Sequence, residues 1–104
     1  MKKQISVKRS VSMDELLSIA KTQFPEKKSG VTKKIDGTFV YININSLFRI
    51  YVKCKMDKQK GSTVVDIYDG VTPLGSLLAY KLYGRSVLKR FMEAAVAAYS
   101  KELL

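Results

Sequence analysis

The sequence contains no histidine, only one cysteine and only two prolines among its 104 residues. Without histidine, the chain lacks the usual general base and the commonest metal ligand of proteins. Because Cys54 is alone, it can form neither an internal disulfide nor a thiolate zinc site. We therefore expect no metal and no other cofactor, and these two absences fit a reducing, cytoplasmic setting best.

A long apolar run is also missing. The most apolar stretch, residues 71–83, is interrupted by Pro73 and Lys81 and is far shorter than the roughly 20 residues that a membrane span needs. We expect this stretch to fill the core or to form an interfacial patch. We do not expect the edge from Leu74 to Tyr83 to attach the protein to a membrane surface. The charged N-terminus is followed by alternating polar residues, so no signal peptide is expected.

No pairing of groups that is typical of catalysis is evident. Asp66 and Asp69 lie on opposite faces of one predicted strand, so they cannot act together at one centre. Cys54 falls in the middle of another strand, on its predicted core face, where nothing activates a thiol. Gly75 and Gly84 lack the strand–loop–helix spacing of a phosphate-binding loop. The sequence therefore predicts a non-enzymatic binding or interaction module rather than an enzyme.

Positive charge is the dominant feature of what is present. The chain carries 19 lysines and arginines against 9 aspartates and glutamates, a formal net charge of +10. This charge favours polyanionic partners, because neutralising phosphates releases counterions. Most of the cations are lysines spread along the chain, which is equally typical of a solvated surface. Nucleic acid or another polyanion is therefore the alternative partner class, beside a protein partner.

Local patterns predict a helix near each end of the chain. Ser12 and Glu15 form a capping box, in which each side chain accepts an otherwise unpaired backbone N–H. Pro25 then ends this first helix. The second helix is expected over residues 85–104. The apolar stripes of the two helices consist of Met13, Leu16, Leu17, Ala20 and Phe24, and of Leu88, Phe91, Met92, Ala95, Tyr99 and Leu103.

The middle of the chain predicts strands joined by hairpins. Asp36-Gly37 is a strong hairpin signal, because both residues of such a turn must accept positive φ. A two-residue loop there makes Ile35 oppose Thr38, Lys33 oppose Val40 and Val31 oppose Ile42. The apolar face of this hairpin then consists of Val31, Ile35, Val40, Ile42 and Ile44.

The lengths of the next two connections can be predicted from the sheet face on which each side chain lies. A slip of one residue moves every side chain of a strand to the other face, so burial should select the register in which the apolar faces agree. We predict a three-residue loop or a bulge at residues 45–47 and a last loop between Asp57 and Ser62. The expected cross-strand pairs are Ile44 with Phe48, Ile42 with Ile50, Val40 with Val52, Val52 with Ile67, Cys54 with Val65, Lys53 with Asp66, and Tyr51 with Tyr68.

These elements predict a single α+β domain over residues 1–104, in the order β-α-β-β-β-β-α. Its antiparallel sheet packs against the C-terminal helix and a shorter N-terminal helix. The first strand is indicated by Ile5, Val7 and Val11, which alternate with polar residues. This strand joins an edge of the meander, and the sequence leaves open which one.

The predicted register places Tyr41, Tyr51 and Tyr68 in one row on the face away from the core. Three interpretations are open. Cross-strand aromatic pairs stabilise a sheet by about 0.2–1 kcal/mol each and need no function. Alternatively, residues 71–83 or a second copy of the protein, as a homodimer, cover the row. As a third interpretation, the rings stack bases while nearby cations contact phosphates. The candidate binding residues are Phe39, Tyr41, Arg49, Tyr51, Lys53, Lys55 and Tyr68.

Overall fold

The computed structural model describes residues 2–44, 49–69 and 85–103. Three expectations fall outside these ranges: the loop at residues 45–47, the pairing of Ile44 with Phe48, and the placement of residues 71–83.

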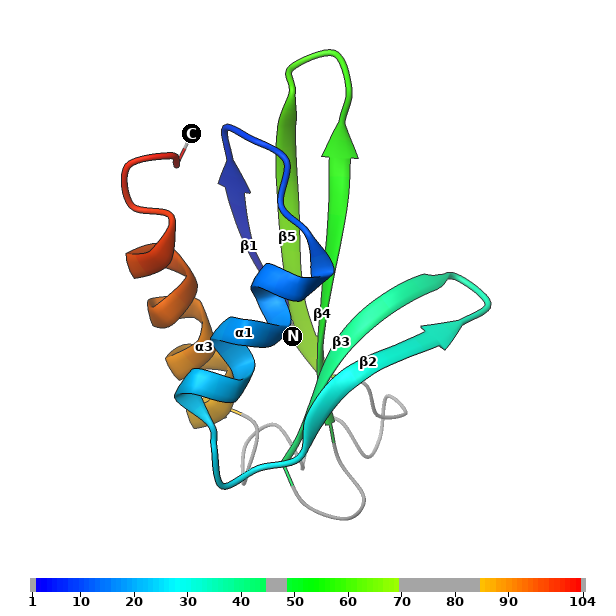
Figure 1. The fold of residues 1–104 in the computed structure, drawn as a ribbon, viewed down its shortest axis with the longest axis vertical. Helices are drawn as coiled ribbons and strands as arrows, with labels where there is room; N and C mark the ends of the chain where they lie inside the picture. The colour runs from blue at the N-terminus through cyan, green and yellow to red at the C-terminus, as the bar shows by residue number, and fades with distance from the viewer. Residues whose placement is uncertain (1, 45–48, 70–84, 104) are drawn as a thin grey trace.

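The described chain forms a five-stranded antiparallel sheet with two helices on one of its faces (Figure 1). The strand order is β1-β5-β4-β3-β2. The predicted α+β fold and the element order β-α-β-β-β-β-α are therefore confirmed. The first strand joins the edge formed by β5. The elements are β1 (Lys2–Val7), α1 (Met13–Gln23), β2 (Ser29–Lys34), β3 (Gly37–Asn43), β4 (Arg49–Asp57), β5 (Ser62–Asp69) and α3 (Arg85–Ala98).

The capping box predicted at the start of α1 is present. The Ser12 hydroxyl accepts a hydrogen bond from the backbone N–H of Glu15 at 3.2 Å, and the Glu15 carboxylate accepts one from the N–H of Ser12 at 3.0 Å. At the other end of α1, Arg90 of α3 donates to the carbonyl of Gln23 at 2.8 Å. Its guanidinium also lies 4.5 Å from the ring centre of Phe24. The two helices are thus joined at the C-terminal end of α1.

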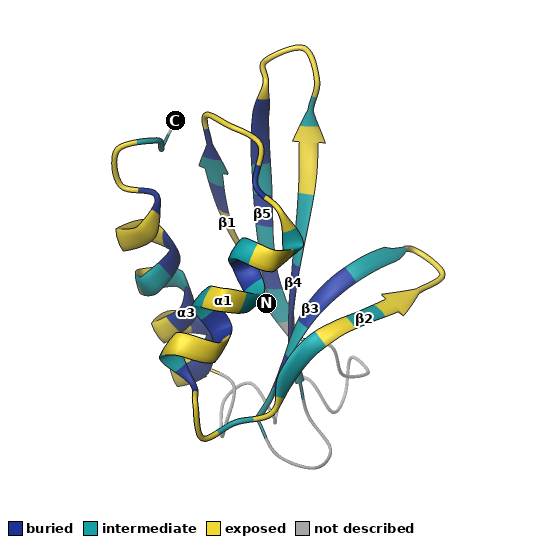
Figure 2. Ribbon diagram, in the orientation of Figure 1, coloured by how far each residue is buried: buried dark blue, intermediate teal, exposed yellow. Residues whose placement is uncertain are grey.

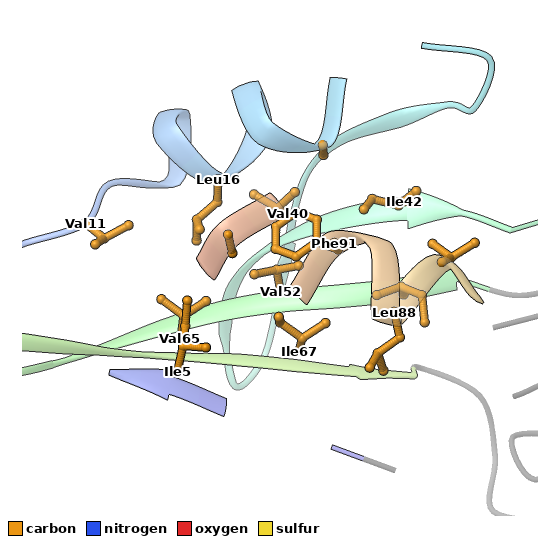
Figure 3. Packing of buried hydrophobic residues seen from close by; sticks show 14 of the residues in the cluster. Ile5, Val11, Leu16, Val40, Ile42, Val52, Val65, Ile67, Leu88 and Phe91 are labelled. Atoms are coloured by element: carbon orange, nitrogen blue, oxygen red, sulfur yellow. The ribbon is translucent and has the colours of Figure 1, made fainter. Parts of the chain in front are cut away.

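The core lies between the sheet and the helices (Figures 2 and 3). Its registers are those expected between the central strands: Ile42 pairs with Ile50, Val40 with Val52, and Val52 with Ile67. Phe91 of α3 is fully buried above these strands. The buried residues that join it from the strands and helices are Ile5, Val7, Leu16, Ala20, Phe24, Val40, Ile42, Ile50, Val52, Val65, Ile67, Val87, Leu88, Ala95 and Tyr99.

The register predicted for the β2–β3 hairpin is wrong by two residues. The structure pairs Val31 with Val40 and Lys34 with Gly37, so the turn consists of Ile35 and Asp36. Gly37 alone takes a positive φ there, 137°, and it already belongs to β3. A shift of two residues leaves each side chain on its predicted face, so burial on one face does not distinguish the two registers.

The predicted apolar face of this hairpin is correct for β3 and wrong for β2. Val40 and Ile42 are fully buried, whereas Val31 is 46% exposed and Ile35 is fully exposed. The hairpin extends away from the helices (Figures 1 and 2), so neither α1 nor α3 covers its tip. Ile44 packs partly buried against the core, as expected.

The elements near the two ends of the chain are shorter than predicted. β1 ends at Val7, and Val11 is buried in the connection to α1 rather than in a strand. The helix α3 ends at Ala98 and does not continue to residue 104. Instead, Leu103 forms a bridge with Val7. The Glu102 carbonyl accepts a hydrogen bond from the backbone N–H of Lys8 at 2.6 Å, while its own N–H donates to the Tyr99 carbonyl at 2.8 Å within a turn.

Replacing Phe91 with alanine should lower the free energy of unfolding by about 3–5 kcal/mol, because it removes a fully buried ring and leaves a cavity. Urea denaturation measures this change. Val96→Ala is the control, since Val96 lies on the same helix but is 36% exposed. Its cost should stay within about 1 kcal/mol. Equal losses in the two variants would contradict the assigned core.

Candidate binding face

The sheet face that points away from the helices carries the predicted tyrosine row. Tyr41 pairs with Tyr51 and Tyr51 pairs with Tyr68, so the register behind the row is confirmed. We call this surface the outer face. The predicted cross-strand pair of Lys53 with Asp66 belongs to it and is also present in the register.

Three rings of the outer face pack against one another, and we call them the aromatic cluster: Phe39, Tyr51 and Tyr68. The centre of the Phe39 ring lies 5.9 Å from that of Tyr51 and 6.1 Å from that of Tyr68, both edge to face. The centres of Tyr51 and Tyr68 are 6.1 Å apart. Phe39 is only 1% exposed and Tyr51 only 6%. The faces of these two rings are therefore not available for stacking with bases.

Tyr41 is engaged differently. Its ring lies against Gly30, its partner in β2, where an added Cβ would come within 3.0 Å of the Tyr41 hydroxyl oxygen. The guanidinium of Arg49 lies 4.3 Å from the centre of the same ring. A side chain at position 30 would therefore force the Tyr41 ring to shift by a few tenths of an ångström. Arg49 and Tyr41 form a cation–π pair of the kind that contributes about 0.5–1 kcal/mol at an exposed site.

Two lysines lie over the aromatic cluster. The Lys34 ammonium is 3.8 Å from the ring centre of Tyr51 and 5.9 Å from that of Phe39. The Lys53 ammonium is 5.5 Å from the ring centre of Phe39 and donates to the carbonyl of Asp36 at 3.2 Å. Lys53 of β4 therefore connects to the turn of the neighbouring hairpin, and the rings support cations from two different strands.

The sequence reasoning missed Lys34. The alternation of side chains along a strand could have identified it. The predicted hairpin register already placed Lys34 across from Phe39 and therefore on the outer face. The two-residue shift changes its partner in β3 to Gly37 but keeps its face.

Lys55 lies further along β4 than the aromatic cluster, where it pairs with Val64. It is exposed. With the β4–β5 turn it lines a shallow depression of about 500 Å³, formed by Lys55, Met56, Asp57, Lys58, Gln59 and Val64. The candidate residues therefore fall into three groups along the outer face: Phe39, Tyr51, Tyr68 and Lys53 at the centre, Tyr41 with Arg49 on one side, and Lys55 beyond the centre.

The two tyrosines at the centre of the cluster differ in their electrostatic surroundings. Burial acts to raise the pKa of Tyr51, but Lys34 and Arg49 near its hydroxyl outweigh burial and hold the pKa below the ordinary value. Burial raises the pKa of Tyr68 to about 12, and the charge of Asp36 adds to this effect. The outer face is therefore electropositive around the Tyr51 hydroxyl and more negative around that of Tyr68.

A second polar cluster lies elsewhere, around Arg9. Its guanidinium donates to both oxygens of Glu15, at 2.7 and 3.2 Å, and to Glu102 at 3.0 Å. It also lies 5.3 Å from the ring centre of Tyr99. The hydrogen bond from Arg9 holds the pKa of Glu15 below its ordinary value. This cluster joins the end of the chain to the start of α1, and we interpret it as structural.

The lone thiol lies where burial disfavours its ionisation. Cys54 is half-buried, its thiol donates to the carbonyl of Val11 at 3.6 Å, and burial raises its pKa. Among the described residues, no group of three or more histidine, cysteine, aspartate or glutamate side chains is placed to hold a metal ion. Nor does any described helix have the length and apolar character to span a membrane.

Comparisons with protein-family models, with curated proteins and with solved structures give no match for this chain. The candidate function therefore depends on the geometry of the outer face.

The raised pKa of Tyr68 predicts a loss of stability at high pH. In the unfolded chain this phenol ionises near pH 10, but in the folded chain near pH 12. Its contribution is therefore complete below about pH 10 and is lost as the pH rises to about 12. In Tyr68→Phe, the free energy of unfolding, measured by urea denaturation across this range, should fall less steeply than in the wild type.

Phe39→Leu is the control for this measurement, since it changes the aromatic cluster without removing a titrating group. It should lower stability equally at all these pH values and keep the wild-type slope. Parallel pH profiles for Tyr68→Phe and the wild type would contradict the assignment.

Proposed function

We propose that this chain is a non-enzymatic binding module that uses its outer face to bind a polyanion. The observation that carries the proposal is the arrangement of Lys34, Arg49 and Lys53 on aromatic rings of one face. Their cationic groups lie 3.8, 4.3 and 5.5 Å from the centres of the rings that support them. Cations that are already positioned lose less side-chain entropy when a ligand binds, so more of the Coulomb attraction appears as affinity.

The electrostatics of the face support the same proposal. Lys34 and Arg49 together overcome the effect of burial on the pKa of Tyr51, which indicates a positive potential at its hydroxyl. Lys53 uses its hydrogen bond to Asp36 for positioning, and an ammonium group has three donors, so two remain for a ligand. The net charge of +10 adds long-range attraction and counterion release.

The acidic residues of the outer face restrict where the ligand binds. Asp36 and Asp66 both act on Tyr68 and help to raise its pKa. An anion is therefore expected on the side of the cluster that carries Lys34 and Arg49, away from Tyr68. Lys55 extends the cationic surface along β4, toward the exposed Lys58 and Lys60 of the turn.

Heparin chromatography tests the proposal. The variant Lys34→Gln/Arg49→Gln should elute at a clearly lower salt concentration than the wild type, because two positioned cations are removed. The matched control is Lys21→Gln/Lys89→Gln, which removes the same charge from exposed positions on the two helices. Circular dichroism establishes that both variants are folded.

On a phosphate polymer, the slope of log affinity against log salt should become less steep by up to about 2 units in the outer-face variant, since each lost phosphate contact removes roughly 0.9. Equal shifts in the two variants would mean that net charge alone determines retention. That result would contradict a specific role for the outer face.

A protein interface is a second candidate function, at a different place from the tyrosine row. Phe39 and Tyr51 are already buried within the chain, so they offer little apolar area to a second copy. In contrast, Val31 of β2 and Ile35 of the adjoining turn are exposed, and β2 is an edge strand of the described sheet. Exposed edges with β-branched side chains are suited to pairing with another strand.

Light scattering over a range of concentrations tests self-association at this edge. The wild type should form a dimer that Val31→Thr/Ile35→Thr reduces to a monomer, because the apolar contact is lost. Val96→Thr, at the exposed position on α3, should leave the mass unchanged. A wild type that is monomeric at every concentration would contradict a homodimer, although not an interface with a different protein.

A further inference from the structure

We propose that the polyanion is a nucleic-acid duplex that the outer face binds through its phosphates, without stacking on bases. This inference rests on the proposed function and gives it a partner class.

The aromatic rings of the outer face offer little surface to bases. Proteins that bind single strands gain about 1–3 kcal/mol for each base stacked on an aromatic side chain. Phe39 and Tyr51 cannot contribute in this way, since they are 1% and 6% exposed. Tyr41 has the guanidinium of Arg49 at 4.3 Å from its ring centre and lies against Gly30. These three rings therefore support the sheet and its cations, and a single strand gains little from them.

Tyr68 is the remaining ring of the row, and it is only partly buried. Its edge-to-face contact with Phe39 engages part of the ring. Its surroundings are also unfavourable for a nucleotide, because the charges of Asp36 and Asp66 act on its hydroxyl. A phosphate attached to a base stacked here would lie close to these carboxylates and would be repelled.

Charge density also favours a duplex over a single strand. A surface that binds through cations alone prefers the partner with the most closely spaced charges. A duplex carries one negative charge per about 1.7 Å of its axis, against one per about 3.4 Å for each strand alone. The local density of negative charge near Lys34, Arg49 and Lys53 is therefore higher beside a duplex than beside a single strand.

The rigidity of β4 favours a duplex as well. Arg49, Lys53 and Lys55 all belong to β4, which is paired on both sides for part of its length, by β3 and β5. The backbone positions of these cations form a row of fixed spacing, about 13 Å from Arg49 to Lys53 and about 6.7 Å from Lys53 to Lys55. A stiff duplex matches such a row with little loss of its own conformational freedom, whereas a flexible strand must be ordered first.

The experiment compares a short duplex with a single strand of the same length and sequence, at several salt concentrations, by fluorescence anisotropy. The wild type should bind the duplex at least about tenfold more tightly than the single strand, with a steeper salt dependence for the duplex. A second duplex of unrelated sequence should bind equally well. DNA and RNA duplexes are both measured, because they share the phosphate chemistry that carries the inference.

Tyr41→Leu provides a variant test, since leucine keeps an apolar side chain against Gly30 but removes the aromatic ring. Because Arg49 loses the ring that positions it, the affinities for the duplex and for the single strand should both fall, and the duplex should remain the more tightly bound of the two. Heparin is measured in parallel with both proteins.

The outcomes separate this inference from the proposed function. Tighter binding of the single strand, or a loss of single-strand affinity alone in Tyr41→Leu, would overturn the duplex inference and leave polyanion binding in place. Binding to heparin but to neither the duplex nor the single strand would also overturn the duplex inference and leave polyanion binding in place. Binding to none of the three polymers would overturn the proposed function itself.

Discussion

The register between β3, β4 and β5 is the constraint on which the rest of the structure depends. Burial places Val40, Val52 and Ile67 in line beneath the helices. Because side chains alternate along a strand, the same register places Tyr51 and Tyr68 together on the opposite face. A slip of one residue would expose the valines and isoleucines, at a cost of about 1.5–3 kcal/mol for each side chain. The core therefore determines the composition of the outer face.

This dependence explains which features of the fold could be predicted from the sequence. The capping box at Ser12 and Glu15 depends on local spacing, and the central registers depend on the agreement of apolar faces, so both were predictable. The β2–β3 register was not, because a two-residue shift preserves the faces and the hairpin lies beyond the helices. The residues after α3 form a long-range bridge, between Val7 and Leu103, which no local pattern encodes.

The candidate site was predictable as a set of residues on one face, but not as an arrangement. The alternation of side chains along each strand is enough to place the aromatic residues and Lys53 on one face of the sheet. It would also have placed Lys34 there. This alternation gives no information on how the rings and the cationic groups lie relative to each other. An open row of rings suits stacking, whereas the observed Phe39 and Tyr51 are buried and Lys34 lies over them. This geometry therefore supports our proposal of a ligand that is bound through phosphates rather than through stacked bases.

The central claim is that Lys34 is held on the ring of Tyr51 before any ligand binds. Nuclear Overhauser contacts in the free protein test it most directly, between the ε-methylene protons of Lys34 and the ring protons of Tyr51. We expect these contacts, together with ring-current shifts of the Lys34 protons to higher field and contacts between the rings of Tyr51 and Tyr68. Lys34 protons at the chemical shifts of a free lysine, with no contact to Tyr51, would contradict the account.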